Sequence, residues 1–114
     1  MGIVTSASSA WAVVVLSGAL EVLFSVAMKL SDGYTKLAAS LVSVAAGLLS
    51  VWLMSLTLKA LPLGTAYAVW AGIGAAGTAI VGIVWFDEPA SVGRIACIGA
   101  VVAGIVGLQL QGSA

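Results

Sequence analysis

The sequence has very little charge. Only 7% of its 114 residues are charged, with four basic and four acidic side chains, and the formal net charge is zero. A soluble domain carries roughly a quarter charged residues, so these few charges cannot cover a water-facing surface. The hydrophobic fraction is 62% and the mean hydropathy is +1.25. We therefore expect an integral membrane protein that has the lipid bilayer as its solvent.

Histidine is absent, and Cys97 is the single cysteine. One cysteine excludes an intramolecular disulfide and a thiolate metal cluster, and the lack of histidine removes the commonest metal ligand and general base. No basic stretch is present, so nucleic acid is not an expected partner. These absences predict no metal and no cofactor. Because no nucleophile–base pair stands out either, an enzyme is the least favoured class.

Four long apolar runs remain between the polar breaks, at about residues 10–29, 37–58, 63–86 and 92–110. Each is near the ~20 residues that cross ~30 Å of hydrocarbon. Backbone groups in lipid must be hydrogen-bonded internally, which favours helices, and the alternating pattern of a β-barrel is missing. We predict an all-α membrane protein with one domain, residues 1–114, forming a four-helix up-down bundle.

The loops show almost no charge bias that would fix the orientation in the membrane. Lys59 and the terminal amine fall on one side, while Lys29, Lys36 and Arg94 fall on the other. The positive-inside rule needs a bias, so the chain is expected to insert both ways. Dual topology would permit an antiparallel homodimer.

Small residues recur along the fourth run at spacings that let helix backbones approach closely. They could pack inside one bundle, but four helices enclose little space for a solute path, which favours a contact between two copies. The predicted dimer-contact residues are Gly99, Ala100, Ala103, Gly104 and Gly107.

Glu21 lies in the middle of the first apolar run, within "WAVVVLSGALEVLFSVAM" (residues 11–28). An acidic residue at a helix centre costs about 2.5–3.5 kcal/mol on insertion scales, so it is usually retained for a function. Desolvation disfavours the charged carboxylate, and Glu21 is therefore expected to take up a proton near physiological pH. No intramembrane Lys or Arg can pair with it, so a cation from outside the protein is the expected partner. The alternative is a structural carboxyl bonded to a neighbouring helix.

Polar and small residues surround Glu21 at helical spacing. Gly18 leaves room one turn before it, and Phe24 and Ser25 lie one turn after it. Ser25 is expected to hydrogen-bond the carboxylate, together with Ser17. Ser50 in the second run is a candidate for orienting Glu21, with simple close packing as the alternative.

The third run contains aromatic residues and many glycines. Tyr67 and Trp70 share a face, and an aromatic pair beside a buried anion suits a cationic ligand. Gly72, Gly74 and Gly77 serve packing or form a hinge. The acids Asp87 and Glu88 look like a solvated helix end to which no chemistry is assigned.

Together these residues resemble the small multidrug resistance family of proton-coupled exporters. The resemblance rests on "SGALEVLFSVAMKLSDGYTK" (17–36), "KALPLGTAYAVWAGIGA" (59–75) and the small-residue fourth run. The second block is similar to the guanidinium-exporter branch rather than the polyaromatic multidrug branch, which typically has Ile after the glycine and Ser-Gly-Val-Gly after the tryptophan. One departure is Phe24, where guanidinium exporters usually have Trp.

The resemblance implies a multi-pass protein of the bacterial inner membrane that works as an antiparallel homodimer. Glu21 would bind either protons or a small organic cation, with Gly18, Ser50, Tyr67 and Trp70 at the site. The favoured hypothesis is a proton-coupled antiporter that exports guanidinium-type cations through a shared Glu21 site. A broader exporter of quaternary ammonium and multidrug cations is the second hypothesis. A non-transporting scaffold subunit, which would tolerate Glu21→Gln, is the third.

Overall fold

The computed structural model describes residues 6–112, and this part of the chain forms four α-helices. They are α1 (Ala7–Leu30), α2 (Leu37–Thr57), α3 (Leu63–Trp85) and α4 (Val92–Gly112). Each is long and apolar enough to span a membrane. The predicted all-helical architecture with four membrane spans is therefore confirmed.

The helix ends coincide with the polar breaks in the sequence. Ser6 caps α1, because its hydroxyl accepts a hydrogen bond from the Ser9 N–H at 3.2 Å. The turn between α1 and α2 places Gly33 (φ 72°) and Tyr34 (φ 64°) in the left-handed region, which glycine adopts freely and tyrosine rarely does. The Tyr34 hydroxyl is hydrogen-bonded to the Ser43 hydroxyl at 2.9 Å, which ties this turn to α2.

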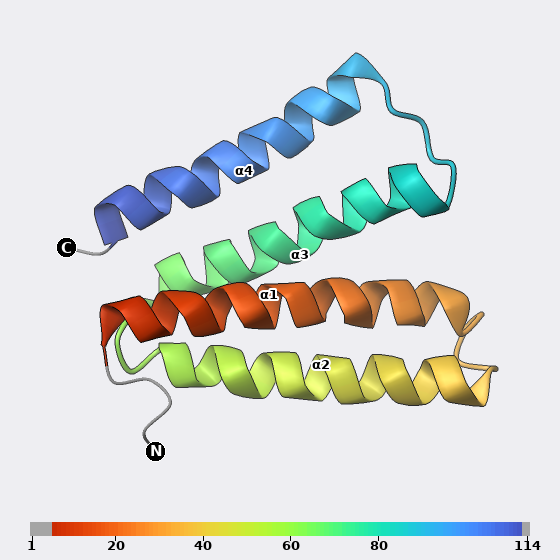
Figure 1. The fold of residues 1–114 in the computed structure, drawn as a ribbon, viewed down its shortest axis with the longest axis horizontal. Helices are drawn as coiled ribbons and strands as arrows, with labels where there is room; N and C mark the ends of the chain where they lie inside the picture. Colours follow the sequence, from red (N-terminus) through yellow and green to blue (C-terminus); the bar gives the residue numbers. More distant parts are fainter. Residues whose placement is uncertain (1–5, 113–114) are drawn as a thin grey trace.

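The helices lie side by side in one row, in the order α2, α1, α3, α4 (Figure 1). The Cα atoms span 41 × 36 × 16 Å, so the row is about as thin as two packed helices. The four predicted helices are thus arranged as an open row. In the described part of the chain α4 packs against α3 alone, and no residue from 92 to 111 is buried.

The interface between α1 and α2 is made by small and hydroxyl-bearing residues of α2. Ser50 donates a hydrogen bond to the Ser17 carbonyl at 2.6 Å, and Ser43 donates one to the Phe24 carbonyl at 3.2 Å. Between them, Gly47 lies under Phe24, whose ring would be 2.8 Å from a Cβ added at this glycine. These contacts require the backbones of α1 and α2 to run close together.

Helices α1 and α3 run in the same direction, and glycines bring them together. A Cβ added at Gly18 would lie 2.7 Å from Ile73, and one added at Gly77 would lie 2.5 Å from Val22. Real Cβ atoms do not approach this closely, so larger residues here would push α1 and α3 apart. The register fixed by these contacts sets which side chains of α1 and α3 face each other.

Candidate functional site

Glu21 lies near the middle of α1, half-buried against α3. The α3 residue beside it is Gly74, which is buried. A Cβ added at Gly74 would lie 2.7 Å from Cγ of Glu21 and 3.2 Å from its Cβ. The absence of a side chain at Gly74 therefore provides the space in which the glutamate stands.

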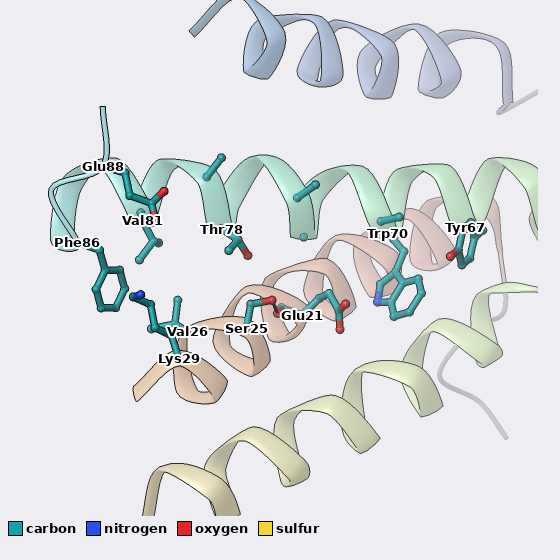
Figure 2. Close-up of a pocket in the computed structure, with 15 residues that line it drawn as sticks. Glu21, Ser25, Val26, Lys29, Tyr67, Trp70, Thr78, Val81, Phe86 and Glu88 are labelled. Carbon is teal, nitrogen blue, oxygen red and sulfur yellow. Dashed lines mark hydrogen bonds between the residues drawn. The ribbon is translucent and has the colours of Figure 1, made fainter. Parts of the chain in front are cut away.

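A cavity of about 530 Å³ extends along the groove between α1 and α3 and includes Glu21 in its wall. Figure 2 shows the Glu21 carboxylate extending toward the Trp70 side of this cavity. Tyr67 also lines the cavity, and its ring lies 5.5 Å from that of Trp70, centroid to centroid. The other polar or aromatic lining residues are Ser25, Lys29, Thr78, Phe86 and Glu88.

A second cavity, of about 410 Å³, lies on the α2 side of the same carboxylate. Glu21 and Trp70 line both cavities, so these two side chains stand between them. The remaining lining is apolar and consists of Phe24, Val44, Gly47, Leu48 and Val51. The predicted lining residue Phe24 thus faces this apolar cavity rather than the larger one.

Ser50 is fully buried and connects all three helices of the site. Its hydroxyl donates to the Ser17 carbonyl of α1 at 2.6 Å and accepts the indole N–H of Trp70 at 2.8 Å. The expectation that Ser50 orients Glu21 is corrected here, because its hydrogen bonds fix Trp70 and the α1 backbone instead. The sequence could not reveal that the Ser50 hydroxyl accepts the hydrogen bond of the Trp70 indole from another helix.

The two serines of α1 also differ from expectation. The Ser17 hydroxyl donates to the Val14 carbonyl at 2.9 Å, and the Ser25 hydroxyl donates to the Glu21 carbonyl oxygen of the backbone at 3.0 Å. Serines in membrane helices commonly bond their own backbone in this way. The expected bonds from these hydroxyls to the carboxylate are therefore not made. Gly18 lies behind the site against Ile73, outside the lining of both cavities.

Charged side chains gather at one end of the larger cavity. The Lys29 ammonium lies over the ring of Phe86, 5.1 Å from its centroid, and Glu88 forms an ion pair with Arg94 at 3.0 Å (Figure 2 shows Lys29, Phe86 and Glu88). Among the described residues, no Lys or Arg forms an ion pair with Glu21. A cation that enters the cavity would therefore not have to displace a basic side chain from the Glu21 carboxylate.

Four polar or aromatic lining residues of the larger cavity were not identified from the sequence. Lys29 lies two turns beyond Glu21 on α1, Thr78 lies one turn beyond Gly74 on α3, and Phe86 and Glu88 follow the end of α3. The helical spacing of Lys29 and Thr78 was a usable signal. Glu88 was assigned to a solvated helix end, but it lines the cavity and packs against Gly82.

The predicted glycines of α3 face two different helices. Gly74 and Gly77 pack against α1, whereas a Cβ added at Gly72 would lie 3.0 Å from Ile105 of α4. On α4, Gly99, Gly104 and Gly107 have open space where a Cβ would stand, and Ala100 and Ala103 are exposed. The small face of α4 is thus left uncovered by the described part of this chain.

The fold and the site define a class, a four-span membrane protein with a glutamate, Glu21, near the middle of a membrane-spanning helix and in the wall of a cavity. Residues 9–110 match the Small Multidrug Resistance protein family, and the chain belongs to this family. It is 48% identical to a "Guanidinium exporter" of Yersinia pseudotuberculosis over 101 residues, covering 89% of this chain and 97% of that protein. It is 45% identical to proteins of the same name from Citrobacter freundii and Salmonella typhimurium, covering 89% of this chain and 96% of each. The family resemblance inferred from the sequence is confirmed.

Proposed function

We propose that the protein is a proton-coupled antiporter that exports small guanidinium-type cations across the bacterial inner membrane. The observation that carries the proposal is the Glu21 carboxylate, which stands in a membrane-level cavity without a basic partner among the described residues. A buried charge requires such a partner or a proton. The relatives named guanidinium exporters support this choice of cation.

The chemistry of the cavity suits a planar cation. A guanidinium presents paired N–H donors that match a carboxylate bidentately, so Glu21 is the proposed primary contact. The aromatic faces of Trp70 and Tyr67 attract the delocalised charge. Ser50 holds the Trp70 indole by a hydrogen bond, and Gly18 lets α3 pack closely behind Glu21. Ser25 completes the wall on the side of α1.

Coupling follows from competition for the same carboxylate. A proton and a guanidinium each neutralise Glu21, and neither binds well when the other is present. Binding of one on either side of the membrane therefore releases the other. Gly72, Gly74 and Gly77 would let α3 bend as the cavity opens alternately to the two sides.

The functional unit we propose is an antiparallel homodimer with dual topology, in which two Glu21 carboxylates form one site. The uncovered small face of α4 supports this, because small residues that no other described residue covers favour close contact with another helix. The near-balance of loop charges supports insertion in both orientations.

A second candidate function is export of a wider range of quaternary ammonium and multidrug cations. The apolar cavity lined by Phe24, Val44 and Leu48 favours it, since such a surface accepts alkyl groups without hydrogen bonds. A non-transporting scaffold is the third candidate, and it does not need the Glu21 carboxylate.

The first experiment is solid-supported-membrane electrophysiology on reconstituted wild type and Glu21→Gln, with guanidinium and with tetrapropylammonium. We expect guanidinium currents from the wild type that are lost in the variant, because the amide keeps the shape of the side chain but cannot bind a cation by charge. Currents with tetrapropylammonium alone would favour the second candidate. A variant that transports like the wild type would contradict any role for Glu21.

A further inference from the structure

Thr78 carries a buried hydroxyl that has no hydrogen-bond partner. Among the described residues this is true of two side-chain atoms, Oγ1 of Thr78 and Nε1 of Trp11, and of these two residues only Thr78 lines the cavity that contains Glu21. A buried polar group without a partner is costly, and in a native structure it calls for an explanation such as a bound ligand or water. Figure 2 shows the Thr78 side chain projecting from α3 toward α1.

The position of Thr78 relative to Glu21 follows from the register of the two helices. Gly74 packs against Glu21, and Thr78 lies four residues further along α3, about 6 Å at 1.5 Å per residue. Because α1 and α3 run in the same direction, Ser25 lies one turn further along α1 at the corresponding level. Ser25 and Thr78 are both in the cavity wall, on the side of Glu21 away from Trp70.

A guanidinium bound to Glu21 leaves N–H groups that the carboxylate cannot accept. The carboxylate takes one edge of the ion, whereas the other edges still need acceptors in a low-dielectric site. Trp70 cannot accept these N–H groups, because an indole N–H only donates hydrogen bonds and this one is already bonded to Ser50. A threonine hydroxyl has two lone pairs. The hydroxyl can also donate a hydrogen bond to the backbone carbonyl one turn earlier in the helix, since threonine in a helix has two accessible rotamers.

We propose that Thr78, together with Ser25, forms a hydrogen-bonding subsite for the N–H groups on the side of the bound cation that is away from Trp70. This inference rests on the proposed function and names the cation class more narrowly. The subsite favours guanidinium-type ions that have free N–H groups on the side away from Trp70. It gives no contact to quaternary ammonium ions, which have no N–H donor.

The test uses Thr78→Val, which is isosteric but lacks the hydroxyl, with Thr78→Ala as a second hydroxyl-free variant and Thr78→Ser as the matched control. Guanidinium affinity is measured by calorimetry on the purified protein. Proton binding at Glu21 is followed separately, without guanidinium, through the pH dependence of tryptophan fluorescence. We expect the guanidinium Kd to rise roughly three- to tenfold in the Val and Ala variants and to stay within about twofold in the Ser variant. The proton titration should be the same in all four proteins.

An unchanged Kd in the Val and Ala variants would overturn the subsite while leaving the proposed function intact. So would a shifted proton titration that accompanies the loss of affinity, because it would indicate general damage to the site. Failure of the wild type to bind guanidinium would overturn the proposed function, and the subsite with it.

Discussion

Trp70 is the residue whose position depends most clearly on a single hydrogen bond. Its indole N–H is bonded to Ser50, which in turn is bonded to the α1 backbone at Ser17. Trp70 lines both cavities beside Glu21, so a shift of the indole would change both. Ser50 lines neither cavity and therefore acts on the site through Trp70.

We predict that Ser50→Ala weakens guanidinium binding roughly three- to tenfold, because the indole loses its acceptor, a bond worth about 0.5–1.5 kcal/mol. Trp70→Phe removes the same bond from the other side. In a double-mutant cycle by calorimetry, the losses of the two single variants should therefore not add. Ser55→Ala is the matched control, since the Ser55 hydroxyl bonds the Trp52 carbonyl of its own helix. Strictly additive losses would contradict a positioning role for Ser50.

The sequence was sufficient to single out some site residues but not others. Glu21 stands out because a carboxylate is expensive in lipid, and Trp70 because an aromatic residue deep in a glycine-rich helix is unusual. Phe86 and Glu88 become cavity residues only through the register of α1 against α3. That register depends on glycine contacts between helices, which no local pattern specifies.

At the scale of the helix, α3 is the element that shapes the site. One face presents Gly74 and Gly77 to α1, and these contacts determine how far Glu21 lies from the aromatic wall. The positions of the helices were predictable from the apolar runs and the polar breaks. The arrangement of the helices in an open row was not predictable, because the sequence shows which residues are small but not which helix they contact.

We predict that Gly74→Ala lowers the thermal stability in detergent and weakens guanidinium binding roughly tenfold or more. The added methyl would lie 2.7 Å from Glu21 Cγ, so either the carboxylate or the helix must shift, and overpacking costs about 1–3 kcal/mol. Gly64→Ala, on the same helix with nothing within 4 Å of the new methyl, is the control. It should bind guanidinium like the wild type and unfold at an equal or higher temperature. Similar behaviour of the two variants would show that the close approach of α3 to Glu21 is not required.

At the scale of the whole molecule, the single chain leaves its cavities and α4 incompletely covered. Helix α4 contacts only α3 in the described part of the chain, and its small residues face away from that contact. A row of helices whose Cα atoms span only 16 Å in the thin direction cannot enclose a path that is closed to lipid on every side. The proposed homodimer would supply the missing wall and bring a second Glu21 to the site.

We predict that Gly104→Leu reduces the dimer affinity roughly tenfold or more, about 1.4 kcal/mol, because a bulky side chain keeps the α4 helices apart. The chain itself has open space at Gly104, so the variant should still fold. Val102→Leu is the control, since Val102 is exposed and lies about 160° around the helix from Gly104. Energy transfer between labelled copies in liposomes reports the dimer, and guanidinium binding is measured in the same preparation. If two copies share the binding site, the Gly104→Leu variant should lose guanidinium binding in proportion to its loss of dimer. A monomeric variant that binds guanidinium with wild-type affinity would show that one Glu21 is enough.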